Sequence, residues 1–213
     1  MKKYNIIYAD CPWNFKTYSD KGKDKSPDKH YQCMSIEDIY NLPVNDIAAD
    51  NSVLFLWVTF PLLQEGLETI KRWGFTYKTC AFNWFKKNKK SNSWFWGMGY
   101  YSRANTELCL LATKGKTLKR ESKSIHQVID TNNPFDILAN YKDYYHDTEF
   151  VDAVIEHHSK KPDIVRDRIV ELFGNLPRIE LFARETYDGW DALGFEINGK
   201  DIRDELNDLI NNE

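Results

Sequence analysis

Five short runs of apolar residues, spread along the chain, most constrain how it can fold. Each run is continuous rather than alternating, and polar or turn-forming residues bound it on both sides. Such a run is typical of a strand that is buried on both faces, as in a parallel sheet covered by helices. The five expected strands are Asn5–Ala9, Val53–Thr59, Thr79–Phe85, Glu107–Ala112 and Arg178–Ala183.

Segments with helical spacing alternate with these runs. Two of them open at a proline and close at a glycine, which is common at helix ends. Strands that alternate with helices predict an α/β fold, a doubly wound and mostly parallel sheet with helices on both faces. The expected helices begin at Ser35 and at Asp147, and extend from Pro61 to Gly74, from Pro162 to Gly174 and from Asp201 to Ile210.

Length and composition narrow the class of protein. The 213 residues fit one domain with a full core, and 12 Phe, 12 Tyr and 7 Trp argue against a disordered chain. The longest apolar run, Val53–Phe60, is far shorter than the roughly 20 residues of a membrane helix, and the first residues do not resemble a signal peptide. The four cysteines are scattered, as in a reduced, cytosolic protein. We expect a soluble, cytoplasmic single domain over residues 1–213.

The net charge of −3 conceals an uneven distribution of charge along the chain. Residues 84–123 contain ten basic residues and two acids, Glu107 and Glu121, so this segment is +8 and the remainder is −11. Basic, loop-rich stretches are expected at about 86–103 and 114–150, followed by a C-terminal helix at 201–212. This asymmetry favours an anionic partner such as nucleic acid. Two solvated lysine-rich loops are the alternative.

The sequence Asp10-Cys11-Pro12-Trp13 directly follows the first expected strand. Ligands of parallel sheets bind beyond the carboxyl ends of the strands. Pro12 restricts the backbone there, so the turn presents a carboxylate, a backbone carbonyl and an indole face together. Two acceptors beside a stacking surface suit a planar group that carries an amine, such as the edge of an adenine. Alternatively, Asp10 caps a turn and Trp13 is buried in the core.

These residues and several later motifs resemble the MT-A70 family of S-adenosylmethionine-dependent N6-adenine methyltransferases. Asp10-Cys11-Pro12-Trp13 resembles the family's Asp-Pro-Pro-Trp motif, with Cys11 in place of the first proline. The resemblance extends from about Tyr4 to Glu196. The other matching motifs are His30–Ser35, Leu42–Val44, Leu54–Thr59, Trp73–Phe75, Gly97–Glu107, Thr113–Gly115, His158–Asp163, Arg178–Arg184, Gly189–Asp191 and Leu193–Gly194.

The resemblance implies a Rossmann-like sheet in the permuted, class-beta methyltransferase arrangement, with the catalytic motif first and the cofactor strand last. It implies methyl transfer from S-adenosylmethionine to the exocyclic amine of adenine. In that reaction the Asp10 carboxylate and the Cys11 carbonyl would accept hydrogen bonds from the amine, Pro12 would stiffen the turn, and Trp13 would stack on the base. Most of the rate should then come from positioning the two reactants.

The family resemblance also assigns cofactor residues. Lys161 would pair with the methionine carboxylate, and Asp10 would border the same site. The last expected strand ends in a small turn, where Arg184 or Glu185 could bind the ribose hydroxyls. Tyr187 stands where some relatives have an asparagine, which weakens the expectation of a ribose contact there. The cofactor-binding residues are thus expected to be Asp10, Lys161, Phe182, Ala183, Arg184 and Glu185.

The basic segment interleaves lysines with tryptophans, which suits phosphates and stacked bases. Trp94 and Trp96 could instead be core residues, and Tyr31, a neighbour of the base by its family position, could be a core tyrosine. The expected substrate-binding residues are Tyr31, Lys86, Lys87, Lys89, Lys90, Trp94, Trp96 and Arg103. No metal is expected, because the adjacent His157 and His158 would diverge on a helix. Residues Thr131–Val151 look like an insertion of unassigned role.

The sequence therefore predicts an N6-adenine methyltransferase that acts on DNA, with RNA as the alternative substrate. A second alternative is a non-catalytic, nucleic-acid-binding subunit of a methyltransferase pair. The retention of Asp10 favours an enzyme, since inactive relatives typically lose the acidic residue of this motif. The expected partners are nucleic acid and either a second copy of the chain or a related subunit, with no membrane.

Overall fold

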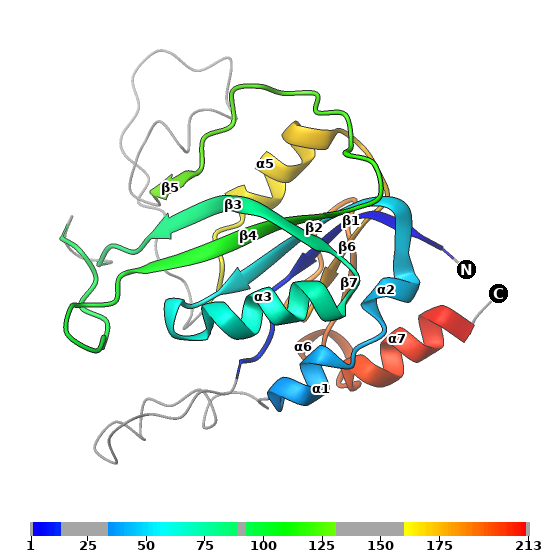
Figure 1. Ribbon diagram of the computed structural model, residues 1–213, viewed down its shortest axis with the longest axis horizontal. Coiled ribbons are helices and arrows are strands. Elements are labelled where there is room, and N and C mark those ends of the chain that lie inside the picture. Colours follow the sequence, from blue (N-terminus) through cyan, green and yellow to red (C-terminus); the bar gives the residue numbers. More distant parts are fainter. Residues whose placement is uncertain (1, 14–33, 89–92, 131–159, 212–213) are drawn as a thin grey trace. The chain divides into compact units, whose positions relative to one another are not determined.

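The computed structural model describes residues 2–13, 34–88, 93–130 and 160–211. These residues form a mixed α/β fold around a sheet of seven strands in the order β5-β3-β4-β2-β1-β6-β7 (Figure 1). The strands are β1 (Tyr4–Ala9), β2 (Ala48–Val58), β3 (Thr76–Phe85), β4 (Thr106–Lys114), β5 (Val128–Asp130), β6 (Arg178–Leu181) and β7 (Asp191–Leu193). The helices are α1 (Ile36–Tyr40), α2 (Val44–Ile47), the 3-10 helix η3 (Phe60–Leu62), α3 (Leu63–Arg72), α5 (Ile164–Phe173), α6 (Phe195–Asn198) and α7 (Ile202–Asn211).

The chain divides into two compact units. The first contains residues 1–79, 110–119 and 175–213, and the second contains residues 80–109 and 120–174. Strands β3 and β4 each contribute residues to both units.

Four parallel strands organise the first unit. Strand β1 pairs with β2 on one side and with β6 on the other, and β6 pairs with β7. Ile7 lies opposite both Leu54 and Ile179, and all three side chains are fully buried. The expectation of buried, parallel strands is thus confirmed for three of the apolar runs, those that begin at Asn5, Val53 and Arg178. The burial explains why these runs are continuously apolar.

Several strand ends differ from the sequence-based expectation. Strand β3 begins at Thr76 rather than Thr79, and β4 ends at Lys114 rather than Ala112. Strand β2 begins at Ala48 rather than Val53, and Ala48 lies opposite Tyr4 across a register shift in the pairing with β1. Strand β6 stops at Leu181 because Phe182 adopts a positive φ of 63°, which no strand residue has. The chain therefore turns away two residues earlier than the apolar run indicates.

Helices α3 and α1 pack together beside β2 (Figure 1). Gly66 lets α3 approach the strand closely, since an added Cβ would lie 3.0 Å from a methyl group of Val58. The Trp73 indole donates a hydrogen bond to the Ile39 carbonyl at 2.8 Å, which ties the end of α3 to α1. Gly74 then ends the helix with a φ of 80°, as expected. The helix starts at Leu63 because Phe60–Leu62 form a 3-10 turn.

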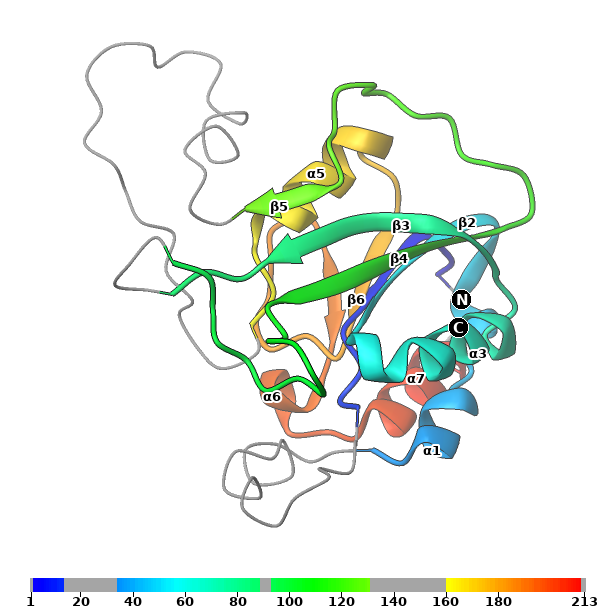
Figure 2. The same ribbon diagram turned by 60° about the vertical axis from the view of Figure 1, so that its left-hand side comes forward.

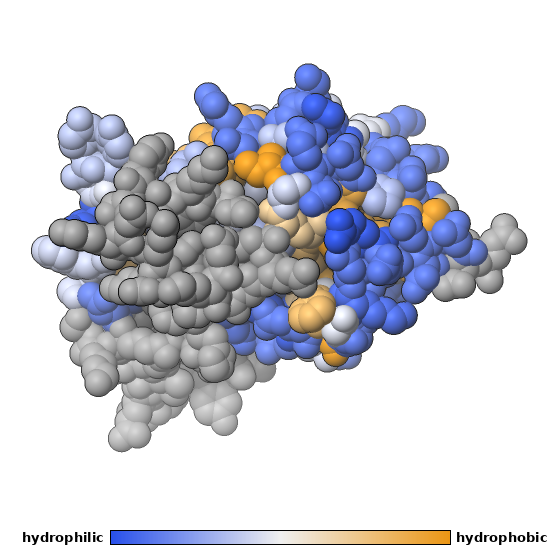
Figure 3. Space-filling model, turned by 90° about the horizontal axis from the view of Figure 1, so that it is seen from below, coloured by the Kyte–Doolittle hydropathy of each residue, from blue (hydrophilic) through white to orange (hydrophobic). Residues whose placement is uncertain are grey.

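Helix α1 begins as expected, with the Ser35 hydroxyl accepting a hydrogen bond from the Asp38 N–H at 3.1 Å. The expected final helix is also present as α7, which contacts α2 and β7 and buries Ile202 and Leu206. The described residues on the face seen from below in Figure 1 are mostly hydrophilic, with hydrophobic residues in small groups (Figure 3). Among the described helices, none has the length and apolar character needed to cross a membrane.

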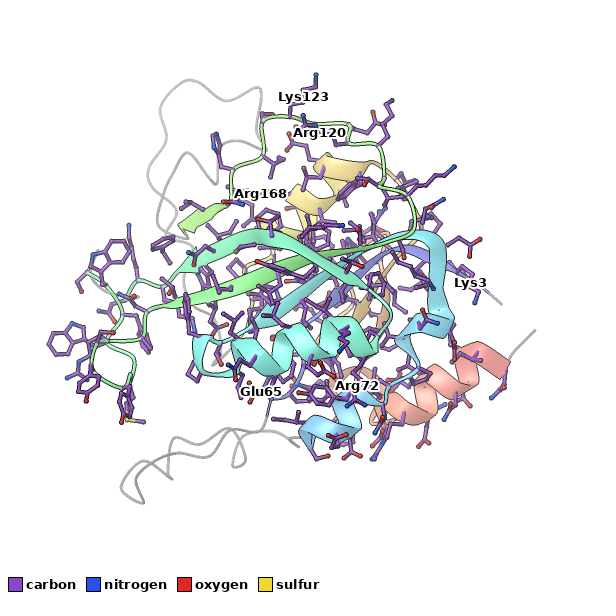
Figure 4. All side chains as sticks on the ribbon, in the orientation of Figure 1. Lys3, Glu65, Arg72, Arg120, Lys123 and Arg168 are labelled. Atoms are coloured by element: carbon purple, nitrogen blue, oxygen red, sulfur yellow. The ribbon has the colours of Figure 1, made fainter. Side chains whose placement is uncertain are left out.

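The second unit contains α5, β5, residues 80–85 of β3 and residues 106–109 of β4. Trp84 of β3 lies opposite Ile129 of β5 in a parallel pair. The buried Arg168 of α5 donates hydrogen bonds to the carbonyls of His126 and Val128, at 3.2 and 2.9 Å (Figure 4). This side chain fastens α5 to β5, which lie side by side in Figure 2. Strands β5 and β7 have three residues each and were not expected from sequence.

Candidate functional site

The backbone of the Asp10–Trp13 motif is held by two hydrogen bonds. The Trp13 N–H donates to the Cys11 carbonyl at 2.8 Å and closes a tight turn, and the Met34 N–H donates to the Pro12 carbonyl at 3.2 Å. Asp10 is half-buried at the end of β1, and Cys11 is buried. A carbonyl oxygen accepts up to two hydrogen bonds, so the bond from Trp13 does not by itself exclude a second donor at Cys11.

Trp13 is buried and anchored to β2. Its side chain is 7% exposed, and its indole N–H donates to the Trp57 carbonyl at 3.0 Å. The indole of Trp57 in turn donates to the Tyr8 hydroxyl at 2.7 Å. These bonds join the motif to the two strands beneath it and fix its position. Burial of Trp13 matches the structural alternative given above, and its stacking on a base stays a prediction.

Aromatic contacts continue from Tyr8 to β6. The Tyr8 ring meets the Trp190 ring edge to face at 5.9 Å, and the Arg178 guanidinium lies 5.6 Å from the centre of the Trp190 ring. Gly189 makes room for this arginine, since an added Cβ would lie 2.4 Å from a guanidinium nitrogen of Arg178. The Gly189-Trp190-Asp191 motif thus supports the sheet next to the Asp10 motif.

The turn after β6 packs closely against Gly194. The Ala183 N–H donates to the Leu193 carbonyl at 2.9 Å, and Ala183 is 2% exposed. An added Cβ at Gly194 would lie 2.2 Å from the Ala183 carbonyl oxygen and 2.7 Å from its nitrogen. The backbone therefore passes through a space that only glycine can occupy at position 194. Arg184 beyond the turn is half-buried and lies 3.5 Å from Glu196.

The first unit brings the Asp10–Trp13 motif and this turn together. Ala9 lies opposite Leu181 in the parallel pairing of β1 with β6. The next residues, Asp10 and Phe182, therefore leave neighbouring strands at the same edge of the sheet. Of the residues expected to bind cofactor, this edge places Asp10 beside Phe182, with Ala183, Arg184 and Glu185 following.

The second unit contains a buried ion-pair cluster that the sequence analysis did not single out. Glu107 at the start of β4 lies 3.1 Å from Lys161 and also pairs with Lys86. Burial alone would raise the pKa of Glu107, but the positive charges of Lys161 and Lys86 outweigh burial and lower that pKa. Lys86 also lies 4.8 Å from the centre of the Trp84 ring. Glu107 thus joins an expected cofactor residue to an expected substrate residue.

The tryptophans expected to bind substrate are exposed. Trp94 and Trp96 are 51% and 70% exposed, so the alternative that they are core residues is wrong. Lys87 lies over the Trp94 ring at 5.3 Å, and Arg103 over the Trp96 ring at 4.7 Å. The sequence pattern of interleaved lysines and tryptophans therefore corresponds to paired side chains. The whole Thr131–Val151 segment and the helix expected from Asp147 lie outside the described residues, as do Tyr31, Lys89 and Lys90.

In α/β sheets, ligands bind beyond the carboxyl ends of the parallel strands, where the Asp10 motif and the glycine-backed turn lie. The MT-A70 family model matches residues 4–196. The chain belongs to the MT-A70 family of methyltransferases, which confirms the resemblance seen in its motifs.

Named relatives are similar to the chain along most of its length. The Type II methyltransferase M.MunI of Mycoplasma sp is 31% identical over 92% of the chain and 78% of its own length. The human N(6)-adenosine-methyltransferase catalytic subunit METTL3 is 24% identical over 95% of the chain and 30% of its own length. The Arabidopsis thaliana non-catalytic subunit MTB is 34% identical over 61% of the chain and 17% of its own length. The chain thus spans less than a third of these plant and human relatives.

Proposed function

We propose that the chain transfers a methyl group from S-adenosylmethionine to the N6 amine of adenine in DNA. The observation that carries the proposal is the register of β1 and β6, which puts Asp10 beside the turn that begins at Phe182. The match to M.MunI over 78% of that relative, which is named a Type II methyltransferase, favours DNA. RNA is the second candidate, because human METTL3, named an N(6)-adenosine-methyltransferase, matches 95% of the chain.

The Asp10 turn would orient the adenine amine by accepting hydrogen bonds from it. The adenine amine is a weak nucleophile because its lone pair is delocalised into the ring. Hydrogen bonds from its two protons to the Asp10 carboxylate and the Cys11 carbonyl would draw the nitrogen towards tetrahedral geometry. The Trp13 anchor to Trp57 holds both acceptors in place. Because the acceptors are fixed before substrate arrives, positioning supplies most of the rate.

The turn after β6 fits the cofactor that the family implies. The close approach of Gly194 to Ala183 keeps side chains out of the space beside this backbone, as a ligand lying against the chain requires. Asp10, Phe182, Ala183, Arg184 and Glu185 would hold the cofactor at this edge. The assignment of Lys161, which belongs to the second unit and pairs with Glu107, rests on the family resemblance alone. When bound, S-adenosylmethionine supplies a methyl group made electrophilic by a positively charged sulfur. The order of the motifs, catalytic strand first, supports the permuted class-beta arrangement.

The exposed cations and indoles of the second unit suit a nucleic acid. Lys87 and Arg103 would bind phosphates while Trp94 and Trp96 meet bases, and Lys86, Lys89, Lys90 and Tyr31 complete the proposed substrate residues. We propose that residues 1–213 act as one methyltransferase domain, with the basic stretches 86–103 and 114–150 bordering the substrate. Arg120 and Lys123, which project from the second stretch, are examples of its charged side chains (Figure 4).

The experiment is transfer of labelled methyl from S-adenosylmethionine to DNA and to RNA, with and without Asp10→Ala. We expect label on adenine in DNA from the unaltered protein and none from the variant, at equal thermal stability. Asp50→Ala, which removes an exposed carboxylate near the start of β2, is the matched control and should retain full transfer. Binding of the cofactor without transfer to either nucleic acid would favour the non-catalytic subunit, the role named for MTB.

A further inference from the structure

An unusually exposed group of large apolar side chains lies in residues 93–105 of the second unit, hereafter the aromatic segment. Isolated exposed aromatic residues are ordinary on protein surfaces, but a contiguous group marks a binding surface. The members of the group and their exposed fractions are Trp94 51%, Phe95 38%, Trp96 70%, Met98 65%, Tyr100 79% and Tyr101 96%.

The aromatic segment has a defined backbone. The Phe95 N–H donates to the Lys86 carbonyl at 3.0 Å, and the Ala104 N–H donates to the Gly97 carbonyl at 3.3 Å. Two glycines permit this close pairing: an added Cβ would lie 1.9 Å from the Ala104 carbonyl oxygen at Gly97, and 2.1 Å from the Ser102 carbonyl oxygen at Gly99. The fold thus holds the rings outward on a narrow, paired ribbon.

The charges around these rings are positive. Lys87 lies over the Trp94 ring and Arg103 over the Trp96 ring, at 5.3 and 4.7 Å. Glu107 is the one acid between residues 80 and 109 of the sequence, and it is buried against Lys86 and Lys161. The surface therefore combines exposed rings with cations and carries no exposed carboxylate over that stretch.

We propose that the aromatic segment stacks on unpaired bases of the nucleic acid while Lys87 and Arg103 contact the adjoining phosphates. This inference rests on the proposed function and specifies its substrate as DNA with exposed bases, either single-stranded or locally opened. Bases that are paired and stacked in a duplex present no free face to a ring, whereas an unpaired base does. In two places a cation lies against a ring, Lys87 at Trp94 and Arg103 at Trp96, so a phosphate and its neighbouring base could be bound together there.

A protein partner fits the same surface less well. Lysine is depleted at protein-binding surfaces, although aromatic residues, methionine and arginine are enriched there. Here Lys87 lies directly over the Trp94 ring, and the sequence between residues 80 and 109 has no acid except the buried Glu107. Charge complementarity therefore favours a polyanion whose flat groups can occupy the remaining exposed ring surface.

The test is binding of the intact chain to a labelled single strand, to its fully paired duplex, and to the same duplex with a central unpaired stretch. Fluorescence anisotropy measures affinity, and quenching of tryptophan emission reports stacking. We expect the single strand and the opened duplex to bind more tightly than the paired duplex. Trp96→Ala and Tyr101→Ala should each weaken single-strand binding about tenfold. Tyr77→Ala, at a 44% exposed aromatic residue of the first unit, should have no effect.

The salt dependence separates stacking from charge. Trp96→Ala should leave the slope of affinity against salt unchanged, whereas Arg103→Ala should reduce it, because only the latter removes a phosphate contact. Equal affinity for all three DNA forms, unchanged by Trp96→Ala, would overturn the inference. Loss of self-association in Trp96→Ala with unchanged DNA affinity would overturn it in favour of a protein interface. The binding assay contains no cofactor and measures no turnover. Its result therefore does not depend on whether the protein transfers methyl groups to DNA.

Discussion

Ala9 at the end of β1 lies directly opposite Leu181 at the end of β6, in a parallel pair. On its other side, Ala9 lies opposite Leu56 of β2, so β1 is a central strand of the first unit. The carboxyl ends of parallel strands share one edge of a sheet, where ligands bind. This one register therefore joins the Asp10 motif to the glycine-backed turn at Phe182, although the two are far apart in sequence.

Gly194→Ala should damage the cofactor turn. The added Cβ would lie 2.2 Å from the Ala183 carbonyl oxygen, so the backbone of the turn must shift. We expect a loss of about 1–3 kcal/mol in the free energy of unfolding and weaker S-adenosylmethionine binding in titration calorimetry. The control is Gly199→Ala, where φ is 73° and no atom lies within 4 Å. It should cost about 1–2 kcal/mol through strain but leave cofactor affinity unchanged; equal affinity in both variants would argue against the proposed turn.

Trp13→Phe should loosen the catalytic motif. The variant keeps an aromatic ring but removes the indole N–H that donates to the Trp57 carbonyl at 3.0 Å. Loss of this buried hydrogen bond should lower the free energy of unfolding by about 0.5–1.5 kcal/mol, which urea unfolding can measure. Trp96→Phe, at a 70% exposed position, should leave the free energy of unfolding unchanged. Comparable losses in the two variants would show that the Trp57 contact does not stabilise the motif.

The central strands of the first unit could be predicted because burial on both faces leaves a continuous apolar signal in the sequence. Residues around Ile7, Leu54 and Ile179 carry that signal and form paired strands. Strands β5 and β7 could not be predicted, since three residues are too few to show a pattern and depend on their neighbours for pairing. The end of β6 at Leu181 could not be predicted from the sequence either, because tertiary structure imposes the positive φ of Phe182.

The candidate site also contains residues that could be predicted from the sequence and residues that could not. The Asp10 motif was recognisable because it directly follows an apolar run, whereas the residues after Leu181 were assigned from the family resemblance. The role of Glu107 was not recognisable, because its two lysine partners come from distant segments. A signal did exist: Glu107 is a lone acid before an apolar strand within a segment of charge +8. The exposure of Tyr100 and Tyr101 leaves no such signal, since tyrosines are common in cores and on surfaces alike.

Glu107→Gln should strongly destabilise the second unit. The carboxylate of Glu107 neutralises Lys161, which is 9% exposed, and Lys86. Removing one partner of a buried ion pair leaves uncompensated charge, which costs about 3–5 kcal/mol. Glu121→Gln removes an exposed acid and should change the free energy of unfolding little. Chemical denaturation at neutral pH compares the two variants, and similar values would exclude a stabilising role for the cluster.

The same cluster predicts a pH dependence of stability. The folded-state pKa of Glu107 is lowered, so the carboxylate stabilises the fold above its unfolded pKa of about 4.3 and loses this effect as the pH falls through the folded value. The stability difference between the unaltered protein and Glu107→Gln should thus be constant near neutral pH and shrink below about pH 4. Asp191 and Asp201 also have lowered pKa values, but they are present in both proteins and cancel in the difference. A difference that stays constant down to pH 3 would contradict the ion-pair assignment.

Cys11→Ala tests whether position 11 acts through its backbone. The carbonyl that would accept a hydrogen bond from the adenine amine belongs to the main chain, and it already accepts one from the Trp13 N–H. Alanine keeps this carbonyl and removes only a buried sulfur, at a cost of about 1 kcal/mol in stability. We expect methyl transfer close to that of the unaltered protein, whereas Asp10→Asn, which exchanges one carboxylate oxygen for an amide, should lower the rate by about 100-fold or more. Radiolabel transfer at saturating cofactor separates these outcomes. An equally large loss in Cys11→Ala, with thermal stability maintained, would assign a role to the thiol itself and remove the backbone carbonyl from the mechanism.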